Sequence, residues 1–310
     1  MRLVLTGGFL GSGKTTAIVC AAQLLMQQNK KVAVITNDQG EQQVDTEFVR
    51  SSGIAAREVL NGCFCCNYWQ LDEHIESLQS CDIVFAESVG SCTDLIATVA
   101  RPLHQARPDI EVVISVFADV KLLANIIAGN EQFQDESVRY IYKKQLEEAD
   151  ILILNKSDLL TTDELRRVDE IIKAEYPSSV ILHQNSLSEE DVMHWLMTVD
   201  KFANHNRNSL DIDYDVYAVG ESKLAWLDKN IIVNTPLMNA IFVAENIIGS
   251  IADRLQSQHV PVGHLKFFLE SGEYKTKISL TPTTTSVDFS LKKFESKAVR
   301  MLVNARLETE

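Results

Sequence analysis

The feature that most constrains the fold is GFLGSGKT at residues 8–15, which fits the pattern G-x-x-x-x-G-K-[ST] at every fixed position. Residues 2–6 form a short apolar run suited to a buried parallel strand, and residues 15–28 carry apolar side chains at helical spacing. A strand that turns sharply into a helix directs backbone N–H groups and the positive end of the helix dipole at one point, where phosphate binds. The pattern therefore predicts a nucleoside triphosphate site in an α/β fold.

The residues of this loop have separate roles in the predicted site. Glycines allow the backbone to curl closely around phosphates. Lys14 can reach the β and γ phosphates, and the Thr15 hydroxyl can ligate Mg²⁺. A glycine-rich turn that precedes a helix by chance is the alternative, but it requires strand, spacing and helix to coincide. The nucleotide contacts predicted here are Gly8, Gly11, Ser12, Gly13, Lys14, Thr15 and Thr16.

Strand and helix patterns alternate through about the first 200 residues, which predicts a doubly wound, mostly parallel sheet. The polar segment 204–209 breaks this periodicity. Beyond it, a helical pattern and two alternating runs that form a hairpin predict a small α+β domain. We therefore expect a P-loop domain over residues 1–205 and a C-terminal α+β domain over residues 210–310. The second contains no recognisable chemical motif, and its lone His259 and His264 are more typical of structural or exposed side chains than of ligands.

Carboxylates follow two apolar runs of the predicted sheet, Asp38 after one and Glu87 after the other. Ligands bind at the carboxyl ends of strands in open α/β sheets. We expect Glu87 beside Mg²⁺ and the Gly90 N–H near the γ-phosphate. Asp38 is a candidate for Mg²⁺, for water positioning or for a second metal, and a solvated turn is the alternative. The predicted catalytic residues are Lys14, Asp38 and Glu87.

Three of the six cysteines lie within four residues, at Cys63, Cys65 and Cys66. Three thiolates can bind Zn²⁺ or Cu(I), with another residue or water completing the site. Neighbouring side chains of an extended segment point apart, so a turn at Gly62 would have to gather them. Buried structural thiols and a redox C-x-C pair are the alternatives. The remaining cysteines, Cys20, Cys81 and Cys92, are each isolated and suit core positions.

A second nucleotide motif, N-K-S-D at residues 155–158, follows the apolar run 151–154. The Asp158 carboxylate can accept hydrogen bonds from N1–H and the amine of guanine, while the Lys156 stem lies along the base. Adenine would leave that carboxylate unpaired at a cost of about 1–3 kcal/mol, so the motif selects GTP over ATP. The predicted guanine contacts are Asn155, Lys156, Asp158, Asn185 and Ser186.

Composition narrows the range of partners. Forty-three acidic against 29 basic residues give a formal charge of −14, which repels nucleic acid and anionic membranes. The first residues begin a strand directly, and no window reaches the roughly 18 apolar residues that a spanning helix needs. We expect a cytoplasmic protein that binds neither nucleic acid nor membrane.

Taken in order, the loop at 8–15, the turn at 37–40, GCFCC at 62–66, ESVG at 87–90 and NKSD at 155–158 resemble the CobW-like branch of the metallochaperone GTPases, which also include HypB, UreG and MeaB. The resemblance covers roughly residues 1–200. It implies a slow Mg²⁺-dependent GTPase that loads or delivers a metal, often zinc, to a client metalloprotein, or that services a corrinoid enzyme. Asp38 stands where the family usually has Glu, no proline closely follows residues 87–90, and the His-rich tract of many relatives is missing.

Three functions are compatible with these motifs. The first is a GTPase that couples GTP and Mg²⁺ to the binding and delivery of a transition metal, with zinc the leading candidate, at Cys63, Cys65 and Cys66. The second is a G-protein chaperone that gates cofactor loading of a partner enzyme, with structural cysteines. The third, a non-hydrolytic metal-binding module, leaves Lys14 and Asp158 without a role. The sequence favours the first and leaves the metal, the client and a homodimer open.

Overall fold

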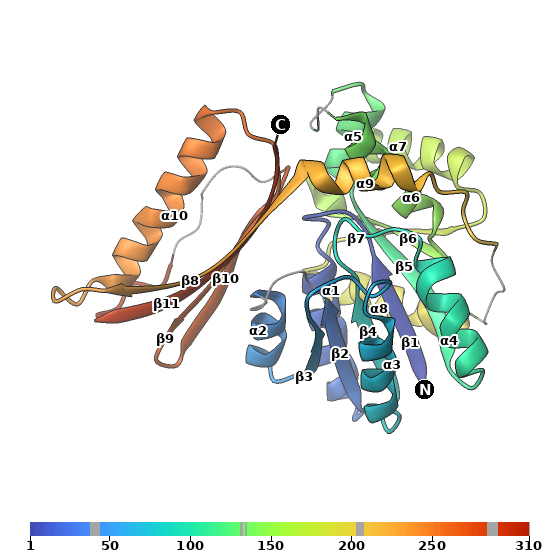
Figure 1. Cartoon of the computed structure of the whole chain (residues 1–310), viewed down its shortest axis with the longest axis horizontal. Coiled ribbons are helices and arrows are strands. Elements are labelled where there is room, and N and C mark those ends of the chain that lie inside the picture. The colour runs from blue at the N-terminus through green and yellow to red at the C-terminus, as the bar shows by residue number, and fades with distance from the viewer. Residues whose placement is uncertain (38–43, 131–132, 134, 203–207, 284–290, 310) are drawn as a thin grey trace.

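The computed structural model describes residues 1–37, 44–130, 133, 135–202, 208–283 and 291–309. The predicted site residue Asp38 lies outside these residues. Within them the chain forms a parallel sheet covered by helices and, beside it, a smaller antiparallel sheet with one long helix (Figure 1). The predicted fold class, a doubly wound parallel sheet with a smaller α+β part, is confirmed.

The larger sheet contains seven strands of the described chain in the order β3-β2-β4-β1-β5-β6-β7, all paired in parallel. Its central strands are nearly continuous apolar runs because helices cover both faces, as is typical of parallel sheets. Every residue of β4 is buried, for example. The strands are β1 (Arg2–Gly7), β2 (Val32–Asn37), β3 (Ala55–Val59), β4 (Ile83–Glu87), β5 (Glu111–Asp119), β6 (Ile151–Asn155) and β7 (Val180–Gln184).

Two hydrophobic cores lie on the two faces of this sheet. The core on one face includes side chains of α1 (Lys14–Gln27), α2 (Val44–Ser51) and α8 (Glu189–Lys201). The core on the other includes side chains of α3 (Tyr68–Ser77), α4 (Arg101–Ala106), α5 (Val120–Ile127), α6 (Glu136–Glu147) and α7 (Thr162–Glu175). No helix in the described part of the chain is long and apolar enough to cross a bilayer.

The carboxyl edge of the parallel sheet gathers the segments that the sequence singles out. Strand β1 lies between β4 and β5, and Thr6 near its end is level with Glu87 in β4. At the neighbouring strand ends, Asp119 of β5 is level with Asn155 of β6. In sheets of this type the strand order reverses at such a point, and the ligand site lies there. The fold therefore brings the loop after β1, the end of β4 and the end of β6 together.

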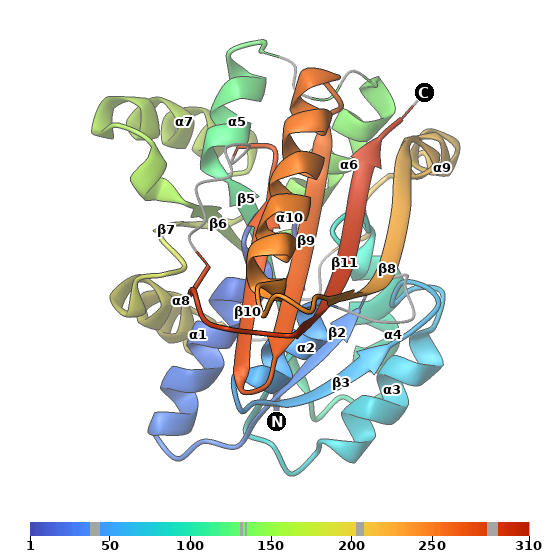
Figure 2. The ribbon, with the colours of Figure 1, turned by 90° about the vertical axis from the view of Figure 1, so that its left-hand side faces the viewer.

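The smaller sheet has the antiparallel order β10-β9-β11-β8. The helix α10 (Ala240–Ser257) covers one of its faces and shares a third hydrophobic core with it (Figure 2). The predicted hairpin is present, with Tyr274 opposite Ser271 and Leu280 opposite Leu265. The strands are β8 (Leu224–Asn234), β9 (Val262–Ser271), β10 (Tyr274–Leu280) and β11 (Ala298–Glu308).

Two helices join the sheets. The helix α2 lies between them, where Val44 packs against Phe268 and Leu302 of the smaller sheet (Figure 1). The helix α9 (Tyr214–Lys223) packs along α6, and the backbone N–H of Asp213 before it donates to the Tyr140 hydroxyl at 2.7 Å. Residues 210–223, assigned above to the C-terminal domain, thus contact the helices of the parallel sheet. The predicted domain boundary stays a prediction.

Candidate functional site

The predicted phosphate loop packs tightly against the ends of β5 and β6, and this packing explains two of its glycines. At Gly8, with φ at 123°, an added Cβ would lie 2.1 Å from the carbonyl oxygen of Phe117. At Gly13, with φ at 91°, it would lie 2.3 Å from Nδ2 of Asn155. Any other residue would therefore push the loop away from the sheet. The helix α1 begins at the next residue, Lys14, so its first N–H groups open into the loop.

The ammonium group of Lys14 is held inside the loop. This side chain is buried, and its Nζ donates to the carbonyl oxygen of Gly8 at 2.6 Å and to that of Phe9 at 3.3 Å. A buried cation needs such acceptors because desolvation is otherwise costly. The loop thus keeps one positive charge in place at its centre.

A carboxylate faces the first turn of α1. The Thr15 hydroxyl donates to Oε1 of Glu87 at 2.8 Å, while the buried Oε2 of Glu87 has no hydrogen-bond partner among the described residues. Burial and the nearby Asp45 carboxylate raise the pKa of Glu87, and three lysines partly offset this. A hydroxyl beside an unpartnered carboxylate oxygen is the hard oxygen donor set that Mg²⁺ takes. Thr15 and Glu87 therefore suit a magnesium site.

Asn155 connects three segments at the carboxyl edge. Its Nδ2 donates to the Ser12 carbonyl oxygen at 2.7 Å, and its Oδ1 accepts from the Ser186 backbone N–H at 3.1 Å and hydroxyl at 2.7 Å. The predicted base contacts Asn155 and Ser186 thus hold the phosphate loop to the loop after β7. Asn185 instead stabilises its own turn, where its Oδ1 accepts from the backbone N–H of Leu187 at 2.9 Å.

The other two residues of the N-K-x-D motif, Lys156 and Asp158, differ in their partners and in their exposure. Lys156 has the left-handed φ of 61°, and its Nζ pairs with the buried Asp119 carboxylate at 2.6 Å. Asp158 is exposed in the helical turn η2 (Ser157–Leu159), where its carboxylate can meet a base from solvent.

The cysteine cluster forms in a tight turn after β3. Backbone N–H groups of Cys66 and Asn67 both donate to the Cys63 carbonyl oxygen, at 3.1 and 2.9 Å. This turn brings the Sγ atoms of Cys63, Cys65 and Cys66 within 4.8 Å of one another. The required gathering of the three thiols is therefore present, and three soft donors of this kind suit a zinc site.

Cys92 is not the isolated core thiol that the sequence suggested. It is buried against Cys63, and hydrogen bonds from the thiols of Cys65 and Cys92 hold the pKa of Cys63 far below its ordinary value. The predicted burial of Cys92 is present, but its predicted isolation is not: Cys92 lies 29 positions from Cys63 in sequence, whereas the strand order β3-β2-β4 brings the loops after β3 and β4 to the same edge. No local pattern around Cys92 signals this contact.

One short segment touches both the phosphate loop and the cysteine cluster. It runs from Glu87, which bonds Thr15, through Gly90, which lines a narrow cavity together with Lys14. Val89 and Cys92 of this segment belong to the same small buried cluster as Cys63, and the thiols of Cys92 and Cys63 are hydrogen-bonded. Residues 87–92 therefore connect the two candidate sites directly.

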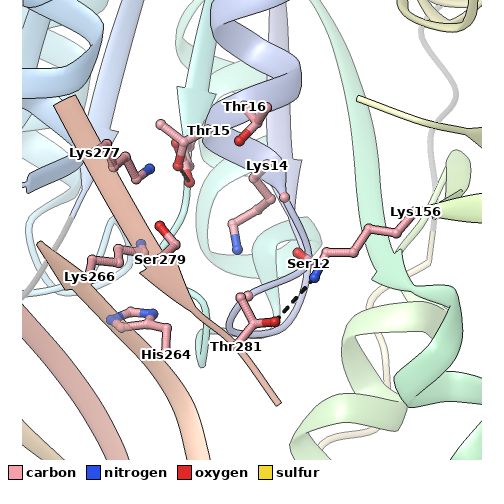
Figure 3. Close-up of a pocket in the computed structure, with 13 residues that line it drawn as sticks. Ser12, Lys14, Thr15, Thr16, Lys156, His264, Lys266, Lys277, Ser279 and Thr281 are labelled. Atoms are coloured by element: carbon pink, nitrogen blue, oxygen red, sulfur yellow. Dashed lines mark hydrogen bonds between the residues drawn. The ribbon is translucent and has the colours of Figure 1, made fainter. Parts of the chain in front are cut away.

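The smaller sheet forms the opposite wall of the cavity in front of the phosphate loop (Figure 3). This cavity has a volume of about 220 Å³. Its wall from the smaller sheet consists of alternate residues of β9 and β10 and of the segment that follows them. These residues are His264, Lys266, Lys277, Ser279 and Thr281.

Both lysines of this wall bind one carboxylate. The Nζ atoms of Lys266 and Lys277 lie 2.5 and 2.6 Å from the two Oδ atoms of Asp45 in the first turn of α2. Burial alone would raise the pKa of Asp45, but the two ammonium groups outweigh it and hold this pKa well below its usual range. His264, which lines the same cavity, is buried, and its ring hydrogen-bonds the Asn304 side chain at 2.6 Å.

A family model for the CobW/HypB/UreG nucleotide-binding domain matches residues 2–182, which is more than half of the chain. The chain belongs to the CobW/HypB/UreG family. The resemblance inferred from the motifs is thereby confirmed, and the phosphate loop, the cysteine cluster and the N-K-x-D motif all lie within the matched residues.

Relatives within the CobW/HypB/UreG family include the zinc chaperone YeiR of Escherichia coli, 30% identical over 52% of this chain and 48% of YeiR. The zinc chaperone CobW of Pseudomonas aeruginosa is 26% identical over 61% of this chain and 57% of its own. The chain thus spans about half the length of these relatives. Among solved structures, nickel-bound HypB from Helicobacter pylori aligns with a TM-score of 0.47 and 16% identity, over 66% of this chain and 90% of that one.

The part of the cavity that sequence reasoning missed lies mainly outside the residues matched to the CobW/HypB/UreG domain. Lys266 and Lys277 belong to strands whose alternation was recognised, but alternation does not say what covers the polar face. Asp45 lies in a helix that was not predicted. The sequence offers no signal for this wall, because lysines that alternate with apolar residues are equally typical of a sheet face that meets solvent.

Proposed function

We propose that this protein is a GTP-binding and GTP-hydrolysing metallochaperone, which couples GTP and Mg²⁺ to the binding and delivery of zinc at Cys63, Cys65 and Cys66. The single observation that carries the proposal is the segment 87–92, because it contacts the phosphate loop at one end and Cys63 at the other. The names of the relatives, zinc chaperones, support the same metal. We expect the protein to act in the reducing cytoplasm on a client metalloprotein.

In this proposal the residues at the carboxyl edge of the sheet bind different parts of the nucleotide. Lys14 binds the β and γ phosphates, and the backbone N–H groups after Gly11 surround them. Asn155 and Lys156 support the base, and Asp158 selects guanine through its N1–H and amine. Asp38 stays a proposed catalytic residue, for Mg²⁺, for water positioning or for a second metal.

Thr15 and Glu87 hold the proposed Mg²⁺, which when bound neutralises charge on the β and γ phosphate oxygens. Glu87 is well suited to this because one of its oxygens is already oriented by the Thr15 hydroxyl. Hydrolysis removes the γ-phosphate, and the segment 87–92 then loses one of the groups that orders it. The thiols that pack against this segment are therefore held differently before and after hydrolysis.

The test is a zinc titration of the reduced protein against a competing chelator, once with Mg²⁺ and a non-hydrolysable GTP analogue and once with GDP. Coupling of about 1–3 kcal/mol, roughly 5 to 150-fold tighter zinc binding in the triphosphate state, is expected. Replacement of Cys63, Cys65 and Cys66 by Ser should remove this difference. A matched control replaces the separate thiols Cys20 and Cys81 and should preserve it.

Two outcomes would count against the proposal. Equal zinc affinity in both nucleotide states would make the cysteines a structural site, as in the cofactor-gating alternative. If the three cysteines do not bind zinc, the proposal that this protein carries zinc at this site is wrong. Linkage provides an internal check, because zinc must tighten binding of the GTP analogue by the same factor.

A further inference from the structure

The smaller sheet presents two chemically different faces. Along β9 and β10, Leu265, Phe267 and Ile278 point into the core under α10. The intervening residues Lys266 and Lys277 point the other way, into the cavity of the phosphate loop (Figure 3). Because side chains alternate along a strand, both lysines lie on this face by virtue of the register. The face toward the cavity is thus positively charged where the other is apolar.

This wall is in direct contact with the phosphate loop. A Cβ added at Gly11 would lie 2.8 Å from Cβ of Thr281, and one added at Gly263 would lie 2.5 Å from Cδ1 of Leu10. The Lys156 Nζ of the N-K-x-D motif also donates to the Thr281 hydroxyl at 3.3 Å. Both walls therefore line a single cavity, and an anion bound by the loop lies within the space that the lysines face.

The charges around this cavity are unequal. Among the described residues that line it or bind its lysines, four supply ammonium groups and three supply carboxylates: Lys14, Lys156, Lys266 and Lys277 against Asp45, Glu87 and Asp119. Lys266 and Lys277 are themselves largely buried, with 13% and 10% of their side chains exposed. The single carboxylate of Asp45 balances only one of these two ammonium charges, and buried charges are stable only when they are paired.

We propose that Lys266 and Lys277 form a second phosphate-binding element, supplied by the smaller sheet, that binds the terminal phosphate of a nucleoside triphosphate in exchange for Asp45. A terminal phosphate carries more charge than one carboxylate and offers three oxygens, so it competes well for two ammonium groups. A nucleoside diphosphate lacks this group. The inference rests on the proposed triphosphate site and adds a sensor for the γ-phosphate to it.

The exchange links nucleotide state to the contact between the two sheets. Asp45 lies in α2, which packs between them, and its contact with the smaller sheet includes these two ion pairs. When the lysines turn to a γ-phosphate, α2 loses them as partners. The lysines of the smaller sheet then bind the nucleotide and no longer bind α2.

The test compares the full-length protein with the double variant Lys266→Gln, Lys277→Gln, and measures the affinities for a non-hydrolysable GTP analogue and for GDP with Mg²⁺. Loss of two charge-assisted contacts should lower the affinity for the GTP analogue by about 10 to 100-fold. GDP affinity should change less than about 3-fold, since the diphosphate does not reach the lysines. Lys275→Gln is the matched control, because the exposed Lys275 lies on the same strand as Lys277, outside the residues that line the cavity, and pairs with Glu270. It should leave both affinities unchanged.

A second variant keeps the inference testable if the double variant folds poorly. Asp45→Asn retains both lysines and removes their competitor, so analogue affinity should rise several-fold while GDP affinity stays constant. If the lysines only fastened Asp45, both variants would affect the two nucleotides alike, which would overturn the inference. Unchanged analogue affinity in the double variant would also overturn it. A wild type that binds neither nucleotide would instead refute the proposed function itself.

Discussion

The two walls of the nucleotide cavity are built on different principles. The first is the phosphate loop and the start of α1, where residues 11–16 contribute in unbroken succession. The second is the face of the smaller sheet, where Lys266, Lys277, Ser279 and Thr281 contribute at alternate positions. A loop that binds with consecutive backbone N–H groups leaves a contiguous motif in the sequence. A sheet face that binds with every second side chain leaves none.

The walls also differ in how they resist change. The first depends on backbone conformation and close packing, as the short contact that any Cβ at Gly8 would make with β5 shows. The second depends on a charge balance between two lysines and Asp45. Substitutions should therefore abolish binding at the first wall and shift affinity or stability at the second.

The largest effect is expected at the first wall from Lys14→Ala. This variant removes the cation at the centre of the loop, so affinity for GTP should fall by more than about 100-fold. Titration with a fluorescent GTP analogue measures it. Lys30→Ala, at an exposed position beyond the end of α1, is the control and should bind normally. An unchanged dissociation constant for the Lys14 variant would contradict the assignment of this loop.

The next largest effect is expected at Asp158, the predicted contact with the guanine base. Asp158→Asn should lower the affinity for GTP by about 10 to 100-fold and shift the preference towards XTP. The reason is that the amide can donate to the oxygen that replaces the guanine amine. Competition between GTP and XTP decides it. Wild-type protein that bound ATP as well as GTP would show that residues 155–158 do not select guanine.

At the second wall, Asp45→Asn should lower the free energy of unfolding by about 1–3 kcal/mol at pH 7, since it leaves two buried ammonium groups without their carboxylate. The pKa of Asp45 is depressed in the folded state, so its stabilisation is complete above the unfolded value of about 3.9 and is lost as pH falls through the lower folded value. The free energies of unfolding of wild type and variant, measured by denaturation, should therefore differ at pH 7 and approach each other as the pH falls below about 4. A constant difference across that range would contradict the ion pairs.

The smallest effect is expected at Lys275, which lies two residues before Lys277 on the same face of β10 but at the outer end of the strand. Lys275 is exposed and its partner Glu270 is half-buried, and ion pairs at the surface contribute about 0–1 kcal/mol. Lys275→Ala should therefore leave the free energy of unfolding within about 0.5 kcal/mol of wild type. A loss as large as that of Asp45→Asn would erase the distinction between this ion pair at the end of β10 and the buried ion pairs of Asp45.

The contrast between the walls also explains what the sequence could predict. Lys14, Glu87 and Asn155 each follow an apolar strand of a parallel sheet, and all such strand ends meet at one edge, so their assembly could be predicted. Cys92 could not be placed, because its contact with Cys63 arises from strand order.

The second wall was beyond prediction for a different reason. The alternation in β9 and β10 predicted the hairpin correctly, but which partner covers the polar face is decided by how the two sheets pack. Asp45 lies in the short helix α2, and α9 docks on α6 although it was assigned to the other domain. Both depend on contacts between segments far apart in the chain.

The central claim, that GTP hydrolysis controls the metal held by the cysteines, can be tested in one measurement. Zinc-loaded protein is mixed with GTP and Mg²⁺ in a single turnover, while a phosphate sensor and a chromogenic chelator follow the release of phosphate and zinc together. The account predicts that zinc reaches the chelator at the rate of phosphate release, and that a non-hydrolysable analogue keeps it on the protein. Phosphate release that leaves zinc bound, or equal zinc transfer with the analogue, would contradict the account.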